Sequence, residues 1–485
     1  MYFSFSRNMV VSKLPPIFYP WRCIILLTLN HLVVSFSTYS LSSYLPHYVK
    51  TLTKNDSTVG VDVGIAFTIF YTALCIGSGV VGTFLRYHSA KSCLIVFQFG
   101  LGVSLFLFGL STNIIWCYVA IGFVGGFIGI TVCIKVLMQS ICADENEDSI
   151  VSWVYGGPLL IGVAFGPSLA GILALPAVQY PSVFDEHGVW ARYPLLLVNL
   201  FLGALATMLS FITYFLLPDD IPAYIRYEGI EHDKMSQRGV YLSVDDTELV
   251  DENGSRSQPL KATLYDCFIN NFLSNPSALA SVALNSLYLG LMDAYQVLIA
   301  LWLETNKDLG GRDYSAKDVS AVMAVSGCIL IILNYTMLNK LYSCMRLKSL
   351  FSLTILISIP IICFLPMLSR INNNKVFFVA CCLLQSIMVV IFTIWSAIIQ
   401  IFTQKAVQVA ALPLIFVLAN LIGYGGSAIL IPFISSIFAK SLRKVEDVSY
   451  LLVDYHLAFY VTALLTLLSC IPLVFIRDEE VTNGS

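Results

Sequence analysis

No aspartate, glutamate, lysine or arginine interrupts the run VFFVACCLLQSIMVVIFTIWSAIIQIF, from Val376 to Phe402. About 20 apolar residues of helix cross a hydrocarbon core of about 30 Å, and only helices or closed barrels satisfy their backbone hydrogen bonds there. The run is far too long for a barrel strand. It therefore predicts a transmembrane helix.

Eleven further runs of the same character surround it. In chain order the predicted spans are Cys23–Leu45, Val63–Leu85, Ser92–Leu110, Ile114–Leu137, Val151–Leu173, Pro194–Leu217, Ala278–Leu303, Val319–Leu341, Leu350–Leu368, Val376–Phe402, Val409–Phe438 and His456–Ile476. A composition of 57% hydrophobic and 12% charged residues agrees with an all-α polytopic membrane protein of twelve transmembrane helices. The formal net charge of −3 gives no reason to expect a nucleic-acid partner.

One long polar interruption divides the chain into residues 1–217, with six spans, and residues 274–485, with six more. The segment 218–273 between them contains Asp245, Asp246, Glu248, Asp251 and Glu252 and has too little apolar content to fold alone. We expect a disordered acidic linker between two pseudo-symmetric six-helix bundles. Secondary transporters are often built in this way, with the solute site near the bilayer midplane between the halves.

The basic residues divide almost evenly between the two sides of the membrane, so charge alone does not orient the chain. The sequons Asn55-Asp-Ser57 and Asn253-Gly-Ser255 are predicted on opposite sides, the first outside the cytosol and able to accept a glycan. The sequence is compatible with the plasma membrane and with an endomembrane such as the vacuolar membrane. We expect a monomer in the bilayer.

Three ionisable side chains inside predicted spans stand out as candidate functional sites, because charge is costly there. Asp293 lies about ten residues from the end of the seventh span, too deep for a short carboxylate to reach water unless it lines a wet cavity. Lys135 lies near the end of the fourth span and either lines the same path or snorkels to the headgroups. His31, beside Asn30 in the first span, is either a path residue or a packing histidine.

Gln296 in the seventh span and Gln385 in the tenth add hydrogen-bonding capacity. The first, fourth, seventh and tenth spans thus each carry polar side chains. If each bundle is built from three-helix repeats, these spans are the first helices of the repeats and can face a central cavity. We expect this set of side chains to form a solute and proton pathway.

The fifth span contains Gly162-Val-Ala-Phe-Gly166-Pro167-Ser-Leu-Ala-Gly171. Pro167 cannot donate a backbone hydrogen bond, and small residues four apart let another helix approach to backbone contact. We expect a bent, tightly packed helix at a gating interface, with structural packing as the simpler interpretation.

This motif resembles the antiporter signature of the major facilitator superfamily, a Gly-x-x-x-Gly-Pro-x-x-Gly-Gly pattern, with Ala170 in place of one glycine. The segments 175–184, 293–302 and 310–327 resemble its zinc-induced-facilitator-like branch, as does Lys135 in the fourth span. The resemblance covers most of residues 20–340. It implies a proton-coupled transporter that works by alternating access, with both termini in the cytosol and a small organic solute as cargo.

Two positions depart from the pattern that the resemblance implies. The loop from Gly82 to Lys91 places Arg86 where the superfamily has an acidic residue that pairs across the bundle interface. Ile121, four positions before Gly125, replaces an expected basic residue and cannot help to move a proton. These departures keep open a receptor or scaffold that has a transporter's fold but does not transport.

Direct zinc transport is a further alternative, although the six histidines are scattered and form no pair at helical spacing. We expect no metal site and no cofactor. A membrane enzyme is disfavoured because the spans contain no Ser/His/Asp grouping and no His-Glu-x-x-His helix. The leading prediction is a proton-coupled transporter in which Asp293 titrates or binds solute.

Overall fold

The computed structural model describes residues 21–53, 56–141, 147–185, 187–217, 275–333, 346–406, 412–442 and 454–476. Within these ranges all regular structure is helical. Eleven described helices are long and apolar enough to cross a membrane, and a shorter apolar helix at Gly157–Leu173 corresponds to the fifth predicted span. The prediction of an all-α polytopic protein is confirmed, whereas the linker predicted over 218–273 lies outside the described residues.

The first half contains α1 (Trp21–Thr53), α2 (Asp56–Tyr87), α3 (Ala90–Gly109), α4 (Ile114–Ile128), α5 (Thr131–Ile141), α6 (Glu147–Leu173), α7 (Pro176–Gln179), α8 (Val189–Arg192) and α9 (Leu196–Leu216). The second half contains α13 (Pro276–Glu304), η2 (Lys307–Leu309), α14 (Ala316–Leu333), α16 (Leu347–Phe364), η4 (Leu365–Arg370), α17 (Asn374–Lys405), α18 (Leu412–Ser441), α19 (His456–Leu468) and α20 (Cys470–Phe475).

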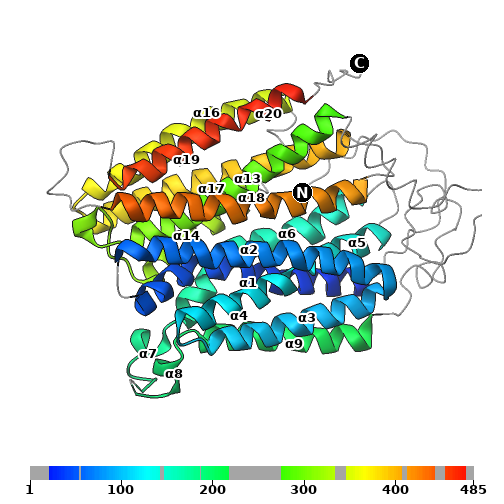
Figure 1. The fold of residues 1–485 in the computed structure, drawn as a ribbon, viewed down its shortest axis with the longest axis horizontal. Helices are drawn as coiled ribbons and strands as arrows, with labels where there is room; N and C mark the ends of the chain where they lie inside the picture. The colour runs from blue at the N-terminus through cyan, green and yellow to red at the C-terminus, as the bar shows by residue number, and fades with distance from the viewer. Residues whose placement is uncertain are drawn as a thin grey trace, which may run out of the picture.

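The helix pairs of the first half recur in the second (Figure 1). In the first half, α1 packs against α6, α2 against α4, and α3 against α9. The corresponding pairs in the second half are α13 with α18, α14 with α17, and α16 with α19. The bundles meet through α2 with α18 and α6 with α14, which is again a symmetric pair of contacts. The described helices therefore form the two pseudo-symmetric bundles that the sequence predicts.

Helix boundaries follow local chemistry. Asn275 caps α13 by accepting hydrogen bonds from the amides of Ser277 and Ala278, and Pro276 occupies the first turn, where its missing N–H is no loss. Helix α1 continues through Pro46 to Thr53, beyond the predicted end at Leu45. The predicted end at Leu45 is therefore too early, because residues on both sides of Pro46 are buried and the helix continues past it.

Three predicted spans are interrupted. The fourth divides into α4 and α5 at Gly129, where the amides of Gly129, Ile130 and Val132 bond three residues back in a tightened turn. The ninth tightens into the 3-10 helix η4, which has Pro366 in its first turn. The twelfth divides into α19 and α20 at Ser469.

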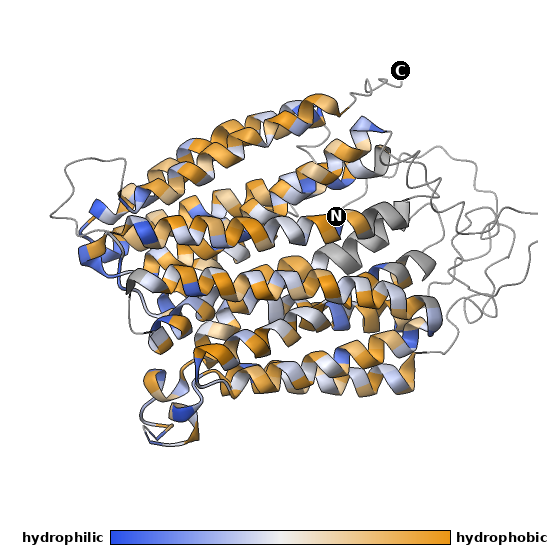
Figure 2. Cartoon of the chain, in the orientation of Figure 1, coloured by the Kyte–Doolittle hydropathy of each residue, from blue (hydrophilic) through white to orange (hydrophobic). Residues whose placement is uncertain are grey.

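Hydrophobic residues predominate along the helices, and hydrophilic residues collect toward the helix ends (Figure 2). Large apolar side chains such as Phe215, Ile115 and Val474 are highly exposed. In a lipid environment exposed apolar side chains are stable, and the helices pair most of their backbone polar groups internally.

The helices of the two bundles share two ends, a linker end and a distal end. The linker end is where α9 finishes at Leu216 and α13 begins at Pro276. The distal end is where α1 finishes at Thr53, α2 begins at Asp56 and α13 finishes at Glu304.

Candidate functional site

Asp293 lies in the middle third of α13 with its side chain half-buried. The hydroxyl of Ser427 on α18 donates a 2.7 Å hydrogen bond to Oδ2 of Asp293, and Ser427 is itself fully buried. Tyr71 of α2 is a second hydrogen-bond partner of the carboxylate. Because Tyr71 belongs to the first bundle and Asp293 to the second, this carboxylate connects the two bundles.

Close contacts at glycines between α13 and α18 bring Ser427 within hydrogen-bonding distance of Asp293. A Cβ added at Gly290 would lie 2.9 Å from the carbonyl carbon of Gly426, and one added at Gly426 would lie 2.4 Å from the carbonyl oxygen of Ser286. The two helix backbones therefore touch in this region, as small residues in membrane helices permit. A larger residue at either glycine would separate the Ser427 hydroxyl from the carboxylate.

Tyr71 is held in place by the packing of α2 on α18. Its ring stacks with that of Tyr424, with centroids 6.3 Å apart, and it is only 6% exposed. On either side, Thr68 donates to the carbonyl of Ala428 at 3.3 Å and Cys75 to that of Leu421 at 3.3 Å. The phenol is consequently fixed at the junction of α2, α13 and α18.

The hydrogen-bond partners described for Asp293 are hydroxyl groups rather than a cationic side chain. An acid inside a membrane bundle without a fixed counter-ion can take up a proton or a positively charged ligand group. The sequence identified Asp293 because its charge stands out in an apolar run. It did not identify Tyr71 or Ser427, because single hydroxyls within apolar runs give no comparable signal.

Gln296 lies one turn beyond Asp293 and pairs with Gln385 of α17. The amide nitrogen of Gln385 donates to the amide oxygen of Gln296 at 3.0 Å. Oε1 of Gln385 is buried and has no hydrogen-bond partner among the described residues. The structure thus brings together Asp293, Gln296 and Gln385, three of the predicted pathway residues, in the second bundle.

The predicted pathway residues of the first bundle lie in helix contacts. Asn30 is fully buried and donates to the carbonyl of Leu26 at 2.8 Å and to Oγ1 of Thr213 on α9 at 3.2 Å. This contact joins α1 to α9 within one bundle and gives Asn30 a packing role. His31 is buried one turn before Ser35, the residue of α1 that touches Gly162 of α6.

Lys135 is half-buried on α5, the short helix that follows the interruption of the fourth span. Gly82 lies on an exposed part of α2, where an added Cβ would have no neighbour within 4 Å. The side chain of Arg86 is outside the described part of the structure, so its predicted place in a gating contact stays a prediction. Neither Gly82 nor Lys135 joins the cluster around Asp293.

The glycine motif of the fifth span faces two partners. A Cβ added at Gly162 would lie 2.5 Å from Cβ of Ser35 on α1. One added at Gly166 would lie 3.2 Å from Cβ of Tyr39 on the same helix. At Gly171 the neighbour is Cβ of Ser320 on α14, 2.5 Å away. Ala164, in the same motif, also meets α14, because a Cβ added at Gly327 would lie 2.2 Å from its Cα. Helix α6 therefore packs on its own bundle through Gly162 and Gly166 and on the opposite bundle through Ala164 and Gly171.

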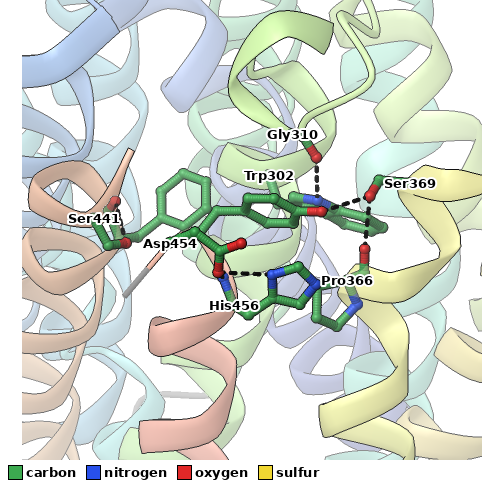
Figure 3. Close-up of polar contacts among 9 residues, drawn as sticks. Trp302, Gly310, Pro366, Ser369, Ser441, Asp454 and His456 are labelled. Carbon is green, nitrogen blue, oxygen red and sulfur yellow. Dashed lines mark hydrogen bonds and ion pairs between the residues drawn. The ribbon is translucent and has the colours of Figure 1, made fainter. Parts of the chain in front are cut away.

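A polar cluster at the distal end of the second bundle was not predicted (Figure 3). The hydroxyls of Tyr455 and Ser369 are 2.7 Å apart, and Nε1 of Trp302 donates to the carbonyl of Gly310 at 3.1 Å. Oδ1 of Asp454 accepts the backbone amide of His456 and lies 2.7 Å from its Nδ1. Burial raises the pKa of Tyr455, so its phenol stays protonated. These contacts fasten the distal loops to one another.

Among the described residues, no group of three histidine, cysteine, aspartate or glutamate side chains is close enough to hold a metal ion.

The sequence of this chain is similar to those of known membrane transporters. The profile described as Major Facilitator Superfamily matches residues 27–429. Among curated relatives, the Protein ZINC INDUCED FACILITATOR-LIKE 1 of Arabidopsis thaliana is 26% identical over 58% of this chain and 55% of its own length. A probable peptide/nitrate transporter of the same plant is 24% identical over 68% of this chain and 65% of its own. The matches thus span somewhat more than half of each relative.

Solved structures share the fold. A bacterial homologue of the human lysosomal transporter Spinster, in an inward-facing and unoccupied conformation, has a TM-score of 0.64 at 13% identity and covers 94% of this chain and 97% of that one. The human organic anion transporter MFSD10 has a TM-score of 0.58 at 12% identity, covering 96% of this chain and 100% of its own. At these identities the likeness concerns the fold alone.

Proposed function

From the membership of this chain in the major facilitator superfamily, shown by the match over residues 27–429, we propose that it is a secondary transporter that moves a small organic solute by alternating access. The family and the fold point to a transporter rather than an enzyme. They make the chain a multi-pass integral membrane protein. The proposed mechanism assigns the coupling proton to Asp293.

Contacts between the bundles near the distal end support alternating access. A Cβ at Gly60 would lie 2.7 Å from the carbonyl oxygen of Ser435, and one at Gly64 would lie 2.9 Å from Cα of Pro432. Helices α2 and α18 therefore approach to backbone contact in the distal half of α2. This geometry corresponds to a state closed at the distal end, from which a transporter must reopen to complete its cycle.

The contact of Asp293 with both bundles carries the proposal. An ionised carboxylate accepts hydrogen bonds from Tyr71 and Ser427, and a hydrogen bond to an ionised group is about twice as strong as a neutral one. Protonation of Asp293 weakens its link to Tyr71 and lets α2 move relative to α13. A proton on Asp293 thus favours exchange between the inward-facing and outward-facing states.

The solute class follows from the side chains near Asp293. The amide groups of Gln296 and Gln385 can donate to and accept from a polar ligand, and Oε1 of Gln385 has no hydrogen-bond donor among the described residues. A small polar organic molecule fits this chemistry. Relatives carry printed names such as peptide/nitrate transporter and multidrug transporter, and a structural neighbour is a nucleoside transporter.

The test uses purified protein in vesicles that contain a pH-sensitive dye. Amino acids, organic ions, nucleosides and metal chelates are added one at a time. We expect at least one solute to produce proton movement with the wild type and none to do so with Asp293→Asn. Asp185→Asn, which changes an exposed carboxylate in the loop between α7 and α8, is the matched control and should behave as the wild type.

The same experiment separates the alternatives. A scaffold without transport would move neither protons nor labelled solute under any condition. A direct metal transporter would respond to zinc ions alone and not to organic solutes. Proton movement that persists unchanged in Asp293→Asn would exclude this residue from coupling.

A further inference from the structure

Glu304, the last residue of α13, is a buried acid that the proposed coupling site does not use. Its side chain is 4% exposed, and neither carboxylate oxygen has a hydrogen-bond partner among the described residues. Burying an ionised carboxylate without donors is costly, and an acid in this position is usually neutralised. Such a residue at the meeting point of two bundles requires a physical explanation.

The surroundings of Glu304 come from both bundles. A cavity of about 20 Å³ is lined by Lys50 of α1, Val59 and Gly60 of α2, Leu301, Glu304 and Thr305 at the end of α13, and Phe438 and Leu442 at the end of α18. This volume is sufficient for about one water molecule. The cavity therefore lies inside the closed distal contact and would be exposed if the bundles separated there.

Among the described residues that line this cavity, Lys50 is the only other ionisable one. Its Nζ donates a 2.9 Å hydrogen bond to the backbone carbonyl of Glu304, at the negative end of the α13 dipole. The ammonium is thus directed at the main chain, and its attraction for the carboxylate acts without a direct hydrogen bond. His47, one turn earlier on α1, interacts electrostatically with Lys50 and with Asp313.

Helix geometry relates Glu304 to Asp293. The two residues are separated by eleven positions, which is about three turns and roughly 16 Å along the axis. Both therefore lie on nearly the same face of α13, the face that meets Tyr71 of α2 in the centre and Lys50 of α1 at the distal end. Helix α13 therefore presents an acidic side chain to the first bundle both near its centre, at Asp293, and at the distal end, at Glu304.

We propose that Glu304 is a second proton-binding site, one that controls the distal gate. With the gate closed, Glu304 is enclosed and is stable in its neutral, protonated form. Opening hydrates the carboxyl group, which then loses its proton to the distal side, and the resulting charge opposes reclosure. Low pH on the distal side should close the gate and high pH should open it. This role rests on the alternating access proposed above but not on Asp293 being the coupling residue.

The experiment measures hydrogen exchange by mass spectrometry on the full protein in lipid nanodiscs, without solute, as a function of pH. The readout is protection of the amides in residues 431–441 of α18, corrected for the intrinsic pH dependence of exchange. For one linked proton, the ratio of open to closed gate changes by at most about tenfold per pH unit. In the wild type we expect protection to fall as pH rises.

Glu304→Gln keeps the shape of the side chain and removes its charge. We expect strong protection at every pH and loss of the pH dependence. Asp308→Asn, four residues further on and exposed, is the matched control and should retain the wild-type dependence.

Wild-type pH dependence in Glu304→Gln would overturn the assignment. Because no solute is present, the measurement is independent of whether Asp293 couples transport. Asp293→Asn should lose proton-driven transport while keeping the pH response of the gate. Failure of this inference and failure of the proposed function would therefore give different results.

Discussion

Replacing Gly60 with alanine is expected to shift the protein away from the state closed at the distal end. The new Cβ would lie 2.7 Å from the carbonyl oxygen of Ser435 and 2.9 Å from Cβ of Ala439. Neither neighbour is the flexible tip of a long side chain, so α2 and α18 must separate by roughly 0.5–1 Å to restore ordinary contact. The clash exists only while the two helices are together.

Overpacking of this kind costs about 1–3 kcal/mol. Applied to the closed state alone, that energy multiplies the ratio of open to closed molecules by about 5 to 150. Gly79→Ala is the matched control, because Gly79 lies on the same helix and its added Cβ meets nothing within 4 Å. Both substitutions remove the backbone freedom of one glycine, so the difference between them isolates the distal contact.

Hydrogen exchange of residues 431–441, on the unmutated helix α18, reports the effect. In Gly60→Ala the amides of these residues should exchange about 5 to 150 times faster than in the wild type. In Gly79→Ala they should exchange at the wild-type rate. Equal protection in the two variants at a fixed pH would show that the α2 and α18 contact does not separate during opening. The account of a distal gate would then be refuted.

Three further predictions concern other parts of the molecule. Tyr71→Phe removes one hydrogen bond to an acid, worth about 1.5–3 kcal/mol when that acid is ionised, so we expect proton-driven uptake to change by tenfold or more. Tyr48→Phe, which loses only a bond to Ser111 inside the first bundle, should leave uptake unaltered. Arg312→Met removes donors to the carbonyls of Ser369 and Ile371 and a guanidinium stacked 4.2 Å from the Phe377 ring centroid. The loss should destabilise the second bundle by about 2 kcal/mol, seen as a lower melting temperature than that of the exposed-site variant Lys375→Met. Expression in a glycosylating cell should place a glycan on Asn55 and none on Asn253, and the reverse pattern would invert the predicted topology.

The sequence predicts the fold well because membrane insertion depends on apolar length, which can be read from the chain itself. The interruptions at Gly129 and Ser469 were not predicted, because hydropathy is insensitive to whether an apolar segment stays α-helical. The predicted end of the first span at Leu45 was also too early, because α1 continues through Pro46 to Thr53. Proline lowers helix propensity, but packing within the bundle determines where the helix ends.

The candidate site was predicted only in part. Asp293 was identified because a carboxylate in the middle of a span is rare, and its link to Tyr71 depends on a contact between helices far apart in sequence. Glu304 was overlooked because it immediately follows the predicted end of the seventh span, where charged residues are normal. Its burial arises only when four helices from two bundles converge. The sequence alone identifies a charged residue near the centre of a predicted span. Whether a charged residue near a helix end is buried depends on tertiary packing.

Two transport modes measured side by side test the central claim most directly. In vesicles loaded with an accepted solute, Asp293→Asn is compared with the wild type in solute counterflow at equal pH and in accumulation driven by a pH gradient. The account predicts that the variant keeps counterflow, because alternating access is intact, but loses accumulation, because no proton is carried. Accumulation at the wild-type level in Asp293→Asn would contradict it.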